Sequence, residues 1–261
     1  MTDPTPLDTA HATMQSAPDD AALRLRFFER LADCELFILL EAEAQGETIK
    51  PEEFEVDGVK YVLAFDREER LAEFVQGAAH HATMSGRMAA RMLAGQGIGL
   101  AVNLGVAPSS ILIPVDAMAW LGEILDETPD EIQAKPVAFS APAGVPETLL
   151  AALDSKLAIA AGLAKTAYLV AVEYEGDNNG HMLAIIDVLS GAEGALAKAV
   201  SEAVSFSGFE TPLDVAFFAG HDPLCSAFQN NGLRFDLPEK KLATHSPAAP
   251  GRDPENPPIL R

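Results

Sequence analysis

The sequence predicts an α+β fold of two small domains, each with helices packed on a short mixed sheet. Short apolar runs of strand character alternate with segments whose apolar residues recur at helical spacing. A proline-rich segment separates two such series. The length of 261 residues suits two modest domains better than one large core, and 48% hydrophobic content excludes a wholly disordered chain.

We expect five segments along the chain. Residues 1–18 contain three prolines and few large apolar groups, so they are expected to be a disordered N-terminal tail. Pro, Ala and charged residues dominate the last segment, which is expected to be a second disordered tail. The predicted order after the first tail is an N-terminal domain over 19–126, a Pro-rich linker over 127–145, a C-terminal domain over 146–237 and the C-terminal tail over 238–261.

In the N-terminal domain, acidic residues at 19–20 favour the start of a helix that continues to 32. The apolar run at 35–40 is typical of a buried strand, and the alternation at 59–65 predicts a second strand. Pro114 is compatible with the first turn of a helix. The remaining elements expected here are helices over 67–76, within 77–93 and over 114–125, and strands over 98–103 and 110–113.

The C-terminal domain is expected to begin with a helix over 147–159. The clearest strand of the chain is 165–175, and Asn-Asn-Gly at 178–180 tolerates positive φ, so a hairpin is expected to lead to a strand over 181–188. The remaining elements expected here are a helix over 191–206, a strand over 212–219 and a helix over 222–229.

The net charge of −21 repels phosphate, so we expect no nucleic-acid binding and no attraction to anionic membranes. This charge suits either solubility or an acidic surface for a basic partner. The first 20 residues lack Lys, Arg and the apolar core of a secretory signal, and no window of 18 apolar residues could span a membrane. Together with only two cysteines, this predicts a cytoplasmic location.

Three segments occur in a suggestive order and spacing: CELFILL at 34–40, YVLAFDREERLAEF at 61–74 and GIGLAVNLGVAPSSILIPVDAMAWL at 97–121. They resemble the N-terminal domain of the SseB family, labelled "enhanced serine sensitivity". Segments at 146–157, 167–169, 181–187 and 213–218 resemble the SseB C-terminal domain. Residues 234–237 depart from the aromatic ending common in that family. The resemblance implies a cytoplasmic bacterial protein of unestablished molecular role, and it carries over no catalytic residue.

Two groups of residues are candidates for ligand or partner binding. Asn103 ends a predicted strand and precedes Gly105 in a loop, so its side chain serves either the turn itself or recognition. Met84, Met88 and Met92 recur every four residues, which predicts a stripe on one helix face. Such a stripe suits either core packing or an adaptable docking groove.

Other motifs do not form a catalytic set. The glycines at 95–99 precede a strand and not a helix, so they are not expected to bind phosphate. The pair at 80–81, two histidines, has no further His or Cys at the spacing that a metal site on a helix needs. Cys225 would meet His221 only if both residues were helical.

We therefore expect no enzymatic activity, no cofactor and no metal. The function favoured by the sequence is a non-enzymatic accessory or interaction protein whose partner is a protein or a small metabolite. One alternative is an amino-acid sensor with a cleft between the domains near Asn103, Gly105 and the linker. A second alternative is a thiol-dependent hydrolase that uses Cys225 and His221, and a third is a role through oligomerisation at a sheet edge.

Overall fold

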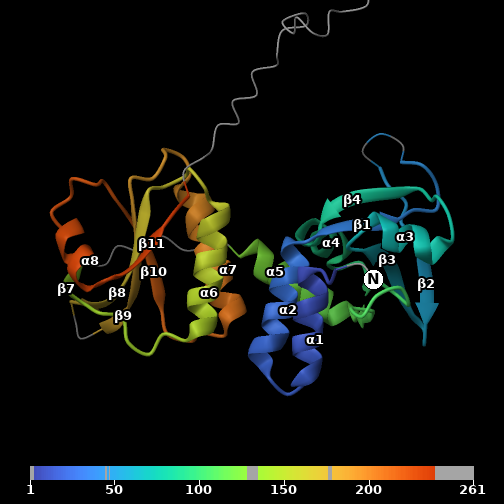
Figure 1. Cartoon of the computed structure of the whole chain (residues 1–261), viewed down its shortest axis with the longest axis horizontal. Helices are drawn as coiled ribbons and strands as arrows, with labels where there is room; N and C mark the ends of the chain where they lie inside the picture. Colours follow the sequence, from blue (N-terminus) through green and yellow to red (C-terminus); the bar gives the residue numbers. More distant parts are fainter. Residues whose placement is uncertain (1–2, 45, 47, 128–134, 176–177, 239–261) are drawn as a thin grey trace, which may run out of the picture.

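The computed structural model describes residues 3–44, 46, 48–127, 135–175 and 178–238. Within these residues the chain forms eight helices and two mixed sheets, so the predicted α+β fold with two domains is confirmed. The two sheets lie at opposite ends of the molecule, and helices fill the space between them (Figure 1).

The sheet of the N-terminal domain has the strand order β4-β1-β3-β5-β6, with β2 also paired to β3. Strands β3 and β5 are parallel, and the other pairs are antiparallel. The bounds are β1 Glu35–Leu39, β2 Glu53–Val56, β3 Val59–Phe65, β4 His81–Ser85, β5 Ile98–Val102 and β6 Ile111–Ile113.

Helices cover both faces of this sheet. Alternate side chains of a strand point to opposite faces, so Val62 and Ala64 of β3 join one apolar core while Leu63 and Phe65 join another. The first core is completed by helices α1 (Pro6–Ser16), α2 (Ala21–Asp33), α4 (Gly86–Leu93) and α5 (Val115–Asp126). The second is completed by α3 (Glu68–Val75). Burial on both faces explains why the sequence of β3 is apolar almost throughout.

The sheet of the C-terminal domain has the strand order β10-β9-β8-β11, with β7 also paired to β8. Helices α6 and α7 pack on the face that carries Leu169 and Leu183, and α8 packs on the face that carries Val170 and Ala184. The bounds are β7 Pro136–Ser140, α6 Glu147–Ile159, β8 Thr166–Tyr174, β9 Asn178–Ile186, α7 Glu193–Ser207, β10 Leu213–Phe218, α8 Cys225–Asn231 and β11 Leu233–Asp236.

The domains meet through helices. In Figure 1, α6 and α7 face α2 and α5 of the N-terminal domain. Phe206 of α7 belongs to the apolar core of the N-terminal domain, and its ring lies edge-on to Trp120 of α5 with the centroids 6.3 Å apart. One side chain of the C-terminal domain is therefore part of the other domain's core.

The predicted disorder of residues 1–18 is wrong, because α1 forms there. Thr5 and Asp8 form a capping box, and Pro6 stands at the first helical position, where a missing N–H costs no hydrogen bond. Leu7 and Met14 insert into the N-terminal core. The proline content was thus misread, since one of the prolines starts a helix.

The expected linker is also partly wrong. Residues 136–140 form strand β7, which pairs with β8 and so belongs to the second sheet. The linker residues 128–134 and the tail residues 239–261 lie outside the described part of the chain. The sequence patterns also missed β2, β4 and β11, which are short strands with little fully buried surface. Among the helices described, none is long and apolar enough to cross a membrane.

Candidate functional site

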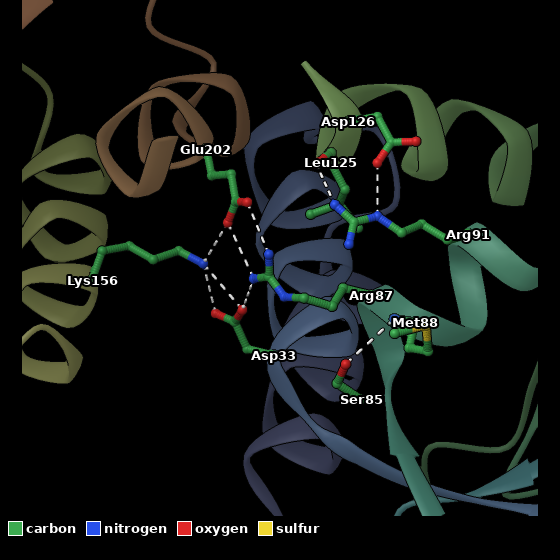
Figure 2. A network of polar contacts seen from close by, with 9 residues as sticks. All are labelled: Asp33, Ser85, Arg87, Met88, Arg91, Leu125, Asp126, Lys156 and Glu202. Carbon is green, nitrogen blue, oxygen red and sulfur yellow. Dashed lines mark hydrogen bonds and ion pairs between the residues drawn. The ribbon is translucent and has the colours of Figure 1, made fainter. Parts of the chain in front are cut away.

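Four charged side chains from four helices meet where the two domains touch, and we call them the inter-domain cluster. Asp33 ends α2 and Arg87 begins α4 in the N-terminal domain. Lys156 lies in α6 and Glu202 in α7 of the C-terminal domain. Figure 2 shows all four pointing toward one another across the boundary.

The charges of the inter-domain cluster alternate around a closed ring. Arg87 donates to Asp33 at 2.8 Å and to Glu202 at 2.9 Å. Lys156 donates to Asp33 at 2.8 Å and to Glu202 at 3.3 Å. Each cation therefore contacts one carboxylate of its own domain and one of the other domain.

Burial strengthens these contacts. The side chains of Lys156 and Glu202 are only 6% and 5% exposed, whereas those of Asp33 and Arg87 are 20% and 30% exposed. Burial opposes ionisation of Asp33, but Lys156 and Arg87 outweigh it and lower the pKa of that carboxyl. Hydrogen bonding to Glu202 raises the pKa of Arg87 above its usual value. The two carboxylates of the cluster are thus matched in number by its two cations.

A hollow of about 330 Å³ opens beside the inter-domain cluster. Its lining adds the cation Lys198 and apolar side chains, including Ile159, Leu163 and Leu196. The hollow thus presents both signs of charge and an apolar wall, which suits a small molecule with a carboxylate and an ammonium group. No hydroxyl or thiol side chain is among its lining residues, and no group of three or more metal-ligating side chains occurs in the described residues.

A second polar group, which we call the N-terminal cluster, lies beneath α1. It consists of Asp8, Asp66, Arg70, Asn103 and Ser109, all nearly inaccessible to solvent. Arg70 donates to Asp8 through both terminal nitrogens and to Asp66 at 2.7 Å. Ser109 donates to Asp8.

Asn103 lies inside the N-terminal cluster and is fully buried. Its Oδ1 accepts from the backbone N–H of Asp66 at 3.1 Å, and its Nδ2 donates to Ser109 at 2.8 Å. Its φ of 50° turns the chain after β5 toward Gly105, whose N–H donates to Ser110 at 3.1 Å. Neither Asn103 nor Gly105 lines the inter-domain hollow, so the expected cleft near them is not where the domains meet.

The three methionines do not share one helix face. Met84 lies in β4, because Ser85 caps α4 and ends the strand before it. Met84 and Met92 pack against the N-terminal core, whereas Met88 is 51% exposed. The predicted stripe is therefore wrong, and two of its members serve core packing.

The thiols are shielded. Cys225 begins α8 and is buried, but His221 lies in the preceding turn and is exposed, so the helical spacing needed to pair them is absent. Burial, aided by Asp222, raises the pKa of the Cys225 thiol. Burial and the Asp66 carboxylate raise the pKa of Cys34 to about 12. Both thiols stay protonated at neutral pH, which disfavours nucleophilic chemistry.

Residues 7–120 match the sequence-family model described as the SseB protein N-terminal domain. Residues 7–120 are therefore an SseB N-terminal domain. The matched range includes α1 from Leu7 onward. It also includes Asp33, Arg87 and the whole N-terminal cluster, whereas Lys156 and Glu202 lie beyond it. No curated protein and no solved structure matches the chain significantly.

The sequence patterns singled out Asn103 but predicted neither of the two clusters. One signal was present, since Lys156 falls on the apolar stripe of α6 beside Leu153 and Leu157, and Glu202 falls between Val200 and Ala203 on α7. A charged residue at a buried helical position usually has a partner. Nothing in the pattern says which residue that partner is.

Proposed function

We propose that this protein, which carries an SseB N-terminal domain, is a cytoplasmic accessory protein that acts by binding a protein or a small metabolite, without catalysing a reaction. One observation supports the proposal above others. The buried charged side chains of the two clusters pair with one another as ions. An enzyme needs such groups directed at a reacting atom.

The best nucleophile candidates lie in poor positions for catalysis. Ser109 is fully buried, and its hydroxyl donates to Asp8 and accepts from Asn103. The two thiols are protonated, as described above. Both observations favour binding over turnover.

Turnover can be tested with a metabolite mixture. Full-length protein is incubated with a mixture of small cellular metabolites, and each compound is quantified by mass spectrometry. We expect no compound to decrease by more than the molar amount of protein, and heat-denatured protein provides the control. Loss beyond that amount, with a matching product, would contradict the proposal.

A second candidate function is amino-acid sensing, and the inter-domain hollow favours it. An α-amino acid carries one carboxylate and one ammonium, which complement the two signs of charge at this hollow. Its side chain could contact Ile159 and Leu163. Binding across the domain boundary would change the contacts between the domains, as sensing requires.

The sensor hypothesis predicts a rise in melting temperature with one or a few amino acids. A panel that includes L-serine is tested by thermal shift and then by calorimetry. Lys198→Gln removes a lining cation that has no ion pair among the described residues, so it should weaken binding without unfolding the chain. Lys165→Gln changes an exposed lysine outside the hollow and is the matched control. Equal binding by both variants would count against the hollow as the site.

A further inference from the structure

The N-terminal cluster lies at a position that often binds ligands in sheets with parallel strands. Asp66 follows β3 and Asn103 follows β5, and these two strands are parallel neighbours. The carboxyl ends of parallel strands lie at the same edge of a sheet, where α/β proteins commonly bind ligands. In this chain that edge is covered by α1.

The polar groups at this edge hold one another in place without help from α1. Asp66 accepts from Arg70 at 2.7 Å, which orients the guanidinium. Asn103 accepts from the Asp66 N–H at 3.1 Å and donates to Ser109 at 2.8 Å, which positions the hydroxyl. Arg70 and Ser109 are therefore preorganised as hydrogen-bond donors, with residues from two separate segments, 66–70 and 103–109, contributing.

The group that these donors bind is a carboxylate from the start of the chain. Arg70 Nη1 donates to Asp8 Oδ1 at 3.0 Å, Arg70 Nη2 donates to Asp8 Oδ2, and Ser109 donates to Asp8 Oδ1. A two-pronged contact from arginine is the geometry with which proteins recognise free carboxylates. Asp8 and Arg70 are 62 residues apart, so the contact is tertiary.

We propose that Arg70 and Ser109 form a carboxylate-binding site, that α1 occupies this site with Asp8, and that a small free carboxylate can replace Asp8 when α1 moves away. A monocarboxylate carries the same charge as Asp8, so the exchange leaves the charge of the N-terminal cluster unchanged. The site is distinct from the inter-domain hollow, and the inference does not depend on what binds there.

Two features of α1 support the exchange. Helix α1 is joined to α2 by the four residues 17–20, so it can move about this connection while α2 stays in place. Its His11 carries a buried Nε2 with no hydrogen-bond partner among the described residues, which lowers the cost of moving α1 away.

An access route lies beside the start of α1. A hollow of about 370 Å³ is lined there by Thr5 and Leu7 of the N-terminal segment and by Asp66. Thr5 donates to Asp66 at 2.6 Å, so the wall of this hollow is directly connected to the carboxylate-binding site. This hollow does not reach Arg70 itself, so a small molecule held there would gain contact with Arg70 only when the N-terminal segment moves away.

Hydrogen exchange of the full-length wild-type chain tests the exchange directly. Sodium acetate is the probe, and sodium chloride at equal ionic strength is the control. Acetate binds only the form with α1 displaced, so at ten times its dissociation constant it should raise that form's population about tenfold. Amides of α1 should then exchange about tenfold faster, while those of β8 should not change. Equal α1 exchange in acetate and chloride up to the solubility limit of acetate would overturn the proposal.

A variant that lacks the internal carboxylate tests whether the site binds free acetate. Asp8→Ala removes the internal carboxylate, so acetate should raise its melting temperature with a saturable dependence. The same salt should give no such rise in wild type or in Asp8→Ala combined with Arg70→Lys, which loses the two-pronged contact. An equal rise in the double variant would assign the effect to the solvent and refute the site. Should Asp8→Ala not fold, the wild-type exchange measurement decides alone.

Discussion

Replacing Lys156 by methionine is expected to lower the free energy of unfolding by about 2–3 kcal/mol. Methionine retains the apolar stem on α6 but removes the charge. Asp33 and Glu202 would then share Arg87 as the one remaining cation of the inter-domain cluster. Stability falls because Asp33 and Glu202 remain buried as carboxylates but no longer have the ion pairs with Lys156 that offset the cost of burying them.

The magnitude follows from the exposure of the four side chains. Breaking a fully buried ion pair costs about 3–5 kcal/mol, and an exposed pair contributes about 0.2–1 kcal/mol. The side chains of Lys156 and Glu202 are 6% and 5% exposed, so breaking their ion pair should cost close to the value for a fully buried pair. Asp33 is 20% exposed, and water therefore screens part of the second contact. The expected loss of unfolding free energy therefore lies between these two ranges.

Urea unfolding of the full chain at neutral pH measures this loss. Lys198→Met is the matched control, because Lys198 lines the same hollow and has no ion pair among the described residues. The control should change stability by less than about 0.5 kcal/mol. A double-mutant cycle with Glu202→Gln should give a coupling energy of about 1 kcal/mol or more. If Lys156→Met and Lys198→Met proved equally stable, the cluster would contribute nothing and the reasoning would fail.

Three further predictions concern other parts of the structure. Burial opposes ionisation of Asp8, but Arg70 outweighs it and holds the pKa of Asp8 below its ordinary value, so the stability that Asp8 contributes above about pH 4 should be lost as pH falls. Asp8→Asn should be roughly 2 kcal/mol less stable than wild type in urea at pH 7. A stability difference that persists unchanged at pH 2 would contradict this. Phe206→Ala should lower the free energy of unfolding by about 3–4 kcal/mol. It should also shift the fluorescence of Trp120 to longer wavelength, because the edge-on contact between the two rings, with centroids 6.3 Å apart, is lost. An unchanged spectrum would show that the Phe206 ring does not shield the indole. Gly86→Ala should destabilise the chain by about 3 kcal/mol or more in thermal unfolding, because a Cβ at this position would lie 1.8 Å from the carbonyl oxygen of Leu31. If the variant were as stable as wild type, α4 would be able to shift at no cost.

The elements predicted correctly from the sequence are those with one dominant pattern. Strand β8 is buried along most of its length and stands out in the sequence, and the alternation at 59–65 was enough to predict β3. Helices α2 and α6 repeat apolar residues on one face. By contrast, α1 depends on its N-terminal capping box and on a few buried side chains, and β4 and β11 are edge strands with few buried residues. Local patterning does not record these tertiary contacts.

The candidate sites were harder to predict for the same physical reason. Asn103 was singled out correctly as a residue at the end of a strand, but its partners Asp66 and Ser109 are known only once β3 and β5 pair. The inter-domain cluster joins Asp33 to Lys156 across 123 residues. A sequence shows that a charge lies on an apolar helix face, but the docking of helices decides which opposite charge it meets.

The alternating ring at the domain boundary has a consequence for motion. The N-terminal domain contributes Asp33 and Arg87, already in contact with each other, and the C-terminal domain contributes Lys156 and Glu202, also in contact. If the domains parted, each would retain a complete, neutral pair, and no lone ion would be stranded against low-polarity surroundings. Separation would exchange two ion pairs for water without reversing any charge balance, so the main cost of opening would be the withdrawal of Phe206 from the N-terminal core.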